Sequence, residues 1–227
     1  MQTAPTARQP TATVEDYLQA LYSLEGEGET VIAARLARRM HVTPPTAWAT
    51  VRRMARDGLV ELDSRKIVHL TARGRELAED ITRRHRLAER YLVDVMGLGW
   101  AEAHEEAHHF EHAITPKLER RVFELAGNPT TCPHGSPIPG TGAKLAPDLV
   151  PITALSPGQE ATIQFISEEL EEDREVLSYL ERGRMTPGNH LRVLESSPST
   201  GIVIVEREGK PVPLALHIAA KIRVRPD

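Results

Sequence analysis

Cysteine is nearly absent from this chain, in which Cys132 is the only one among 227 residues. A lone cysteine excludes an intramolecular disulfide and a cysteine-based zinc knuckle, because both need several thiols. The chain also lacks an apolar run of transmembrane length and a charged-then-apolar signal sequence. Aromatic residues are few, at 4%, although a hydrophobic content of 40% is enough for ordinary cores. These scarcities predict a soluble, cytoplasmic protein with no membrane partner.

The net charge of −4 conceals a basic segment. Residues 30–75 contain ten Lys or Arg against three Asp or Glu, a net charge of +7, so the rest of the chain carries −11. A basic segment within an acidic chain is the electrostatic footprint of DNA binding, because phosphates attract clustered cations.

The same segment has the pattern of a helix-turn-helix. After a short strand at 30–32, a helix rich in Ala, Arg and Leu runs to about Met40, and a tight turn leads into a second helix from Thr43 to Gly58. Thr43 is expected to cap this second helix through its hydroxyl. The two prolines after it stand where a missing N–H costs nothing. The second helix is basic, as a recognition helix would be.

A predicted wing follows the helix pair. Two short strands, 60–62 and 67–70, are joined by a turn whose Arg65 and Lys66 are well placed for phosphate contact. The alternative is a small α+β packing unit with a solvated basic face. A basic wing next to a basic second helix favours DNA binding over that alternative.

Helices flank the basic segment on both sides. Residues 14–25 place apolar side chains on one helical face, and residues 72–96 form a long helix. The long helix has more apolar surface than one neighbour would cover, which predicts a dimer interface. On it, His85 and Glu89 stand four residues apart, close enough to share a metal ion or only an i,i+4 hydrogen bond.

The stretch His104–His112, with the sequence HEEAHHFEH, holds four histidines and three glutamates in nine residues. On a helix His108, Glu111 and His112 project together, with His104 one turn earlier on nearly the same stripe. Imidazoles and carboxylates that converge in this way suit a first-row divalent metal ion. The alternative is an exposed, acid-rich helix with incidental histidines.

Residues 104–108 also fit H-E-x-x-H, the zinc-protease pattern in which two histidines hold zinc and the glutamate is the general base. Three fixed letters in five residues are weak evidence. They nevertheless define a second hypothesis, a zinc metalloenzyme that uses His104, Glu105 and His108. A third hypothesis is a metal-trafficking adaptor that binds protein through its C-terminal region.

The last third of the chain changes character. Residues 128–157 are rich in Pro, Gly, Ser and Thr and show no period, which predicts a linker. A small β-barrel is predicted from four short β-like runs, at 161–166, 191–194, 202–205 and 218–224. The acidic tract 168–173 is interpreted as a solvated face or as a source of oxygen ligands.

Seven short motifs keep a distinctive order along the chain: E-D-Y-L at 15–18, R-M-A-R-D-G-L-V at 53–60, L-T-x-x-G at 70–74, H-R-L-A-E-R at 85–90, E-H at 111–112, E-R-R at 119–121 and G-S-P-I-P-G at 135–140. No single motif is decisive, but their order and spacing together are highly specific. By these motifs the chain resembles the diphtheria toxin repressor family of metal-dependent transcriptional regulators, over nearly its full length.

The resemblance implies a mainly α N-terminal two thirds, made of a winged helix-turn-helix and a helical dimerisation domain, and a small C-terminal SH3-like β-barrel. The implied domains are a DNA-binding domain at 1–75, a dimerisation and metal-binding domain at 76–140, a Pro-rich linker at 141–157 and an SH3-like (FeoA-like) domain at 158–227.

The resemblance also implies two metal sites per subunit. Carried over residue by residue, the primary site consists of Asp16, His108, Glu111 and His112. The ancillary site consists of His85, Glu89 and His104, with two ligands supplied from the β-barrel, Glu168 and Glu171. This assignment gives His104 and His108 to different ions, so Glu105 would not be a general base.

The implied primary site contains nitrogen and oxygen ligands but no sulfur. Iron sensors of the family have a methionine in place of Asp16 and a cysteine in place of His108. Manganese sensors have a glutamate in place of His108 and a second glutamate in place of Gln19. The absence of soft ligands favours Mn²⁺ or Fe²⁺, with a lean toward Mn²⁺, whereas Zn²⁺, Co²⁺ or Ni²⁺ would also bind in vitro.

The function implied by the resemblance is that of a metal-dependent transcriptional repressor of metal-uptake genes, and not of an enzyme. It would bind a pseudo-palindromic double-stranded operator as a homodimer once metal had fixed the DNA-binding domain through Asp16. The residues expected at the DNA surface are Arg35, Thr43, Pro45, Thr46, Ala49, Arg53, Arg56, Arg65 and Lys66. Ala49 stands where relatives have a polar base-contacting residue, and Trp48 is interpreted either as a thymine-methyl contact or as a core residue.

Overall fold

The computed structural model describes residues 10–227, and the chain divides into two compact units between Thr82 and Arg83. The division falls inside a long helix, α4 (Ala72–Asp94). Within the described residues, none of the helices has the length and apolarity needed to cross a bilayer.

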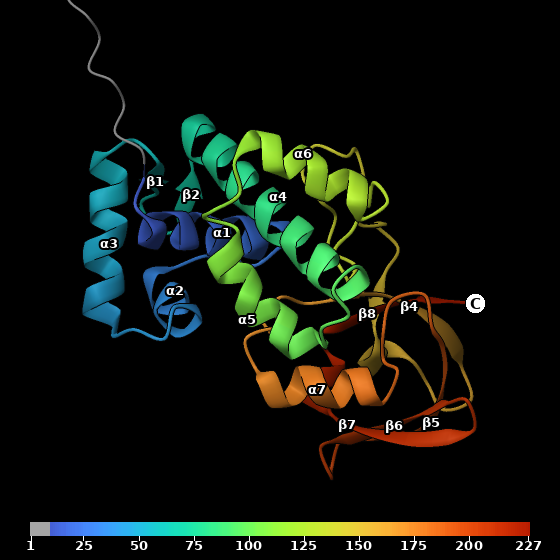
Figure 1. Ribbon diagram of the computed structural model, residues 1–227. Coiled ribbons are helices and arrows are strands. Elements are labelled where there is room, and N and C mark those ends of the chain that lie inside the picture. The colour runs from blue at the N-terminus through green and yellow to red at the C-terminus, as the bar shows by residue number, and fades with distance from the viewer. Residues whose placement is uncertain (1–9) are drawn as a thin grey trace, which may run out of the picture. The chain divides into compact units, whose positions relative to one another are not determined.

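The first unit is a winged helix-turn-helix (Figure 1). Its core consists of fully buried aliphatic side chains, among them Leu18, Leu21, Leu36, Val51 and Met54. Strands β1 and β2 form the wing as an antiparallel pair, with Glu61 opposite His69. The elements of this unit are α1 (Ala12–Gly26), α2 (Ala33–Arg39), α3 (Pro44–Arg56), β1 (Val60–Leu62), β2 (Val68–Leu70) and the start of α4.

Two local expectations for this unit are wrong. Residues 30–32 do not form a strand: the Val31 carbonyl accepts one hydrogen bond from the Val68 N–H, at 2.8 Å, and one bond makes no ladder. Thr43 stands at the N-cap of α3, but its hydroxyl pairs with the Thr46 hydroxyl, at 2.8 Å, instead of accepting a backbone N–H. The prolines do occupy the first helical positions, as expected.

Gly74 fixes the way in which the wing meets α4. The Thr71 hydroxyl accepts the Gly74 N–H at 3.0 Å and donates to the Gly58 carbonyl at 2.8 Å, so the first turn of α4 is held close to the start of β1. A Cβ atom at Gly74 would lie only 1.9 Å from the Leu59 carbonyl oxygen. The glycine of the L-T-x-x-G motif is therefore required by a close approach of two backbones.

The second unit combines helices with a six-stranded antiparallel sheet of strand order β3-β8-β4-β5-β6-β7. Its helices are the rest of α4, α5 (Trp100–Phe110), α6 (Pro116–Leu125), α7 (Arg174–Arg182) and α8 (Leu216–Ala219). Its strands are β3 (Val150–Pro151), β4 (Glu160–Ile166), β5 (His190–Ser197), β6 (Ile202–Arg207), β7 (Lys210–Ala215) and β8 (Ile222–Pro226).

The C-terminal region differs from its predicted outline in four places. The run predicted as β at 218–224 begins in helix α8 and becomes a strand only at Ile222. The sheet begins at Val150, inside the predicted linker, and Ile152 directly after β3 is fully buried. Strand β7 was not expected, because its sequence KPVPLA carries two prolines. The acidic tract leads into an unexpected helix, α7, which Asp173 caps by accepting the N–H groups of Glu175 and Val176 at 3.0 and 3.1 Å.

Helix α7 joins the sheet to α5, beside which it lies in Figure 1. Trp100 of α5 shares a core with Leu177 and Leu180 of α7 and with the sheet. Gly99, at the N-cap of α5, has no side chain to offer, and the Glu181 carboxylate instead accepts the Trp100 N–H at 3.2 Å. A carboxylate at a helix N-terminus is favourable electrostatically, so α7 stabilises the start of the histidine-rich helix.

We expect Gly74→Ala to destabilise the protein by about 1–3 kcal/mol, the usual cost of overpacking. The added methyl group would collide with a backbone oxygen that can move only if the wing moves. Urea unfolding followed by circular dichroism measures the loss. Gly26→Ala is the matched control, because a Cβ there would meet nothing within 4 Å. Equal stability of the two variants would contradict this account.

Candidate metal centre

Metal-ligating side chains of the second unit gather in one interior cluster. They come from α4, from α5 with its last turn, from the loop 131–137 and from the turn before α7. Helix α4 supplies His85 and Glu89, and α5 with its last turn supplies His104, His108 and Glu111. Sequence reasoning placed all five in metal sites. Three more members come from the loop 131–137 and from the turn before α7: Cys132, His134 and Glu171, of which Glu171 is also a predicted ligand. All of these side chains are buried except His108, which is half-buried.

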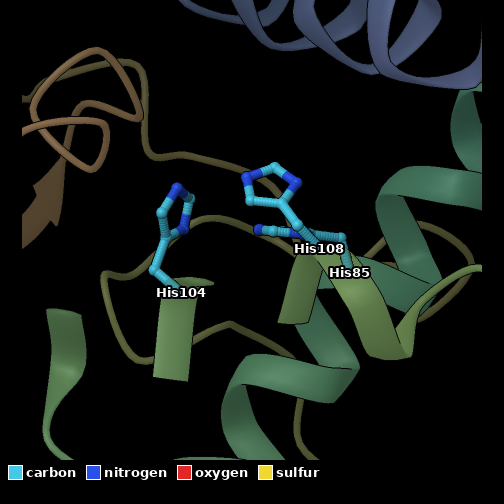
Figure 2. Close-up of side chains that lie close together, drawn as sticks. All are labelled: His85, His104 and His108. Atoms are coloured by element: carbon cyan, nitrogen blue, oxygen red, sulfur yellow. The ribbon is translucent and has the colours of Figure 1, made fainter. Parts of the chain in front are cut away.

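His85 is the centre of the cluster. Its Nδ1 pairs with Glu111 Oε2, and its Nε2 lies 3.3 Å from Glu89 Oε1, so one imidazole lies between two carboxylates. Figure 2 shows its ring converging with those of His104 and His108. The ring centroid of His85 lies 5.2 Å from that of His104 and 4.7 Å from that of His108. His85 therefore links the residues predicted for the primary site to those predicted for the ancillary site.

Glu89 organises the deeper half of the cluster. Its Oε1 lies 2.8 Å from His104 Nδ1 and 3.7 Å from His134 Nδ1. The same His134 nitrogen lies 3.1 Å from Glu171 Oε1. Carboxylates and imidazoles thus alternate through the interior, and each buried acid has a base within ion-pairing distance.

The pKa values follow from this alternation. Burial by itself would lower the pKa of His85, but the carboxylates of Glu111 and Glu89 outweigh it and hold that pKa well above its usual value. Burial likewise opposes the charge of His104, yet its contacts with Glu172 and Glu89 raise the pKa to about 9. Burial would raise the pKa of Glu111, but chiefly His85 brings it down to about 2. Without a metal ion, the cluster is therefore a set of ion pairs.

The H-R-L-A-E-R motif also builds the scaffold of the cluster. Arg86 and Arg90 stand four residues apart on a second face of α4. Arg90 donates to the carbonyls of Thr131 and Cys132, at 3.0 and 2.8 Å, and Arg86 donates to the carbonyl of Pro137. The two arginines thereby clamp the loop that presents Cys132 and His134.

Glu168, predicted as an ancillary ligand, is placed differently. Its Oε1 accepts hydrogen bonds from Arg86 Nε and Nη2, at 2.9 and 2.6 Å. Both side chains are buried, and an arginine buried without a carboxylate would be costly. Glu168 is absent from the groups of metal-ligating atoms in the described residues, whereas Glu171 is among them.

Sequence reasoning missed Cys132 and His134. Both were assigned to a linker, because the composition of 128–157 is typical of one. Cys132 and His134 are completely buried, and their Sγ and Nδ1 atoms are 3.9 Å apart. The Cys-x-His spacing was the available signal, but it gains meaning only when a helix supplies further ligands beside it.

Glu111 and His112 lie in the turn that ends α5. Glu111 Oε1 is 3.4 Å from His112 Nε2 and 3.9 Å from His108 Nδ1, so these three predicted primary ligands are close together. Asp16, the fourth, lies on α1 of the first unit.

Glu105, the general base of the H-E-x-x-H hypothesis, is exposed and faces away from the cluster. It accepts hydrogen bonds from Arg174 Nη1 of α7, at 2.8 and 2.9 Å. It therefore serves to attach α5 to α7. The sequence therefore matches the zinc-protease pattern, but the Glu105 side chain does not lie beside the two histidines as a general base would.

The cluster fits a metal ion by two criteria. First, it contains three groups of residues whose ligand atoms lie within 4.8 Å of one another. The groups are His85, Glu89, His104 and Glu171; His85, His104 and His108; and Glu89, Cys132 and His134. Second, among the described residues five buried side-chain atoms of the cluster have no hydrogen-bond partner: Glu89 Oε2, His104 Nε2, Glu111 Oε1, His134 Nε2 and Glu171 Oε1. Buried polar atoms normally have partners, so those without one mark a place for a further ligand.

The first unit presents most of the predicted DNA-binding residues on its surface. Thr43, Pro45, Thr46, Ala49, Arg53 and Arg56, all on or next to α3, are exposed, as are Arg65 and Lys66 of the wing turn. Arg35 is the exception, because it is half-buried and pairs with Glu29.

Comparison with known proteins gives three consecutive matches along the chain. Residues 10–68 match "Iron dependent repressor, N-terminal DNA binding domain". Residues 71–140 match "Iron dependent repressor, metal binding and dimerisation domain", and residues 150–226 match "FeoA domain".

Relatives match over nearly the whole chain. The iron-dependent repressor IdeR of Mycobacterium leprae is 38% identical over 224 residues, which cover 93% of this chain and 96% of that protein. The diphtheria toxin repressor of Corynebacterium diphtheriae is 34% identical over 220 residues, with 93% and 96% covered. A solved manganese-dependent transcriptional repressor in complex with manganese has a TM-score of 0.80 at 32% identity and covers 94% of this chain and all of that one.

Fold, cluster and comparisons together define a metal-dependent, DNA-binding transcriptional regulator. The chain belongs to the iron-dependent repressor family, which includes the diphtheria toxin repressor. The predicted fold class, helical in the N-terminal part with a C-terminal SH3-like sheet domain, is confirmed. Its relatives are repressors and not enzymes, so the zinc-metalloenzyme hypothesis is set aside.

We expect the protein loaded with Co²⁺ to show a thiolate-to-cobalt charge-transfer band in the near ultraviolet. The reason is that Cys132 lies with Glu89 and His134 in one group of ligand atoms, and a metal ion binds the thiolate. Absorption spectroscopy should show that Cys132→Ser lacks this band. A wild-type spectrum without the band would remove the thiol from the ligand set.

We expect the metal-free protein to lose stability as the pH rises from about 6.5 through about 9. The folded state holds the His104 proton up to about 9, whereas the unfolded chain releases it near 6.5, so this contribution is complete below 6.5 and gone above 9. Urea unfolding in a chelator across this range measures the loss. His104→Gln should make the profile less steep without abolishing it, because the pKa of His85 is raised as well. An equally steep profile in that variant would contradict the assignment to His104.

Proposed function

We propose that this chain is a repressor of metal-uptake genes that binds a pseudo-palindromic operator as a homodimer when Mn²⁺ or Fe²⁺ is bound. It would act in the cytoplasm, where the DNA lies. Family membership supports the DNA-binding and dimerisation domains. The observation that carries the metal dependence is the buried cluster of alternating carboxylates and imidazoles in the second unit.

We infer two metal sites per subunit. Glu111, His108 and His112 would hold one ion, which the resemblance completes with Asp16. This set offers nitrogen and oxygen ligands only, which suits Mn²⁺ or Fe²⁺, although Zn²⁺, Co²⁺ or Ni²⁺ would compete in vitro. The second ion would be held by His85, Glu89, His104, Glu171 and His134, with Cys132 as a softer ligand. Glu168 is left out, because it neutralises Arg86.

The proposed metal ligands would affect the DNA-binding unit because their carboxylates can share one site only when a cation is bound there. A bound divalent ion supplies the positive charge that several carboxylates need in order to share one site. Asp16 lies on α1, whose buried face is part of the core of the helix-turn-helix. If Asp16 contributes to the site, its engagement restricts the orientation of the DNA-binding unit. Operator affinity then rises because a larger fraction of the protein is competent to bind.

Two recognition helices in a homodimer would enter successive major grooves, about 34 Å apart. Affinity would come mainly from the cations of α3 and of the wing. Ala49 is exposed where a polar side chain would read a base, so base readout would depend on the neighbouring residues Thr43, Pro45 and Thr46.

The test is fluorescence-anisotropy binding to a palindromic operator selected from genomic DNA, with Mn²⁺, Fe²⁺ (anaerobically) and Zn²⁺ titrated separately. We expect binding that requires metal and weakens steeply as salt is raised. Glu111→Gln should reduce the metal-dependent gain in affinity, roughly 5–150-fold for a typical coupling, because the substitution removes a buried ligand charge.

Glu105→Gln is the matched control for Glu111→Gln. It makes the same chemical change in the same histidine-rich stretch, but at an exposed carboxylate outside the cluster. It should bind DNA with the metal dependence of the wild type. Operator binding that is indifferent both to metal and to Glu111→Gln would reject the proposed function.

A further inference from the structure

The wing turn contains a residue in a backbone conformation that favours glycine. Lys66 has a φ of +61°, in the left-handed region. Three-residue hairpin loops commonly place glycine at such a position. The rest of the turn is fixed by Asp63, whose carboxylate accepts the N–H groups of Arg65 and Ile67, both at 2.8 Å. Lys66 thus occupies, at the tip of the wing, a backbone position that favours glycine.

The side chain of Lys66 reaches the recognition helix. Its Nζ lies over the indole of Trp48, 6.0 Å from the ring centroid. Trp48 is on α3 and is half-buried, and Ala49 next to it is exposed. A cation at this distance over an aromatic face is attracted by the ring. Trp48 is therefore neither a simple core residue nor a free surface residue.

We propose that Trp48 is a positioning residue of the DNA-binding surface: its indole holds the Lys66 ammonium and so fixes the wing tip relative to the recognition helix. The inference rests on the proposed function. A flexible lysine side chain loses conformational entropy when its ammonium is localised on a phosphate. The indole restricts that stem before DNA arrives, and the ammonium keeps its exposed side free for a phosphate oxygen.

The exposed face of α3 contains two kinds of side chain with different roles. The small side chains at the start of the helix, from Thr43 to Ala49, allow close approach to the groove. Trp48 is a large side chain among them, and it contacts the wing. Its effect on DNA binding is therefore predicted to act through Lys66.

The contact itself can be tested in the free protein. Proton NMR should show the ε-methylene protons of Lys66 shifted upfield by the indole ring current in the wild type, and unshifted in Trp48→Leu. Trp48→Leu retains apolar bulk but removes the ring. An unshifted wild-type signal would overturn the proposal whether or not the protein binds an operator, so this readout is independent of the proposed function.

The role in binding can be tested by a double-mutant cycle on the metal-loaded protein, with anisotropy as the measurement. Lys66→Gly removes the cation at a backbone position that glycine prefers, so folding is preserved. Trp48→Leu should weaken operator binding about 2- to 5-fold per DNA-binding domain, the range of an exposed cation–π contact. Trp48→Phe, which keeps an aromatic face, should retain most of the affinity.

The decisive result is the effect of Trp48→Leu in the Lys66→Gly background. We expect almost no further loss there, because the residue that Trp48 positions is already missing. A loss of the same size in both backgrounds would overturn the proposal and show that Trp48 acts on DNA or on folding independently. If the wild type binds no operator under any metal while the NMR shift is present, the proposed function fails and the Trp48–Lys66 contact stands.

Discussion

The second unit depends on the neutralisation of three buried carboxylates, Glu89, Glu111 and Glu171. A carboxylate buried without a cation would cost far more than a folded protein can lose, since net stability is small. In the metal-free protein, imidazoles supply the positive charge, which is why the pKa of His85 is high and that of Glu111 low. A divalent ion can replace the protons on the same atoms. The interior can therefore remain folded in both states while its charge distribution changes.

The H-R-L-A-E-R motif interleaves ligands with scaffold. His85 and Glu89 stand on one face of α4 and point into the cluster, and Arg86 and Arg90 hold the loop 131–137. Because each pair is spaced by four residues, one helix can present both without conflict. The two arginines thus hold the loop of the candidate metal centre in place without being candidate ligands themselves.

The FeoA-like region is part of the structure around the candidate metal centre. Glu181 accepts the first N–H of the histidine helix, Arg174 binds Glu105, and Glu171 enters the cluster itself. These three contacts come from α7 and the turn before it; the resemblance named Glu171 as a ligand, but the helix itself was not predicted. Residues 83–227 accordingly form one compact unit.

The sequence by itself determined the helices of the winged unit, the family, and six members of the cluster, because helical spacing and local motifs are properties of neighbouring residues. Spacing and the resemblance together named six of them: His85, Glu89, His104, His108, Glu111 and Glu171. Only the tertiary structure placed Cys132 and His134 among them and paired Glu168 with Arg86, because these contacts join residues 37 to 82 positions apart. No local pattern encodes such pairings. They are decided by the way the loop and α7 pack on α4, where a buried charge must find its partner.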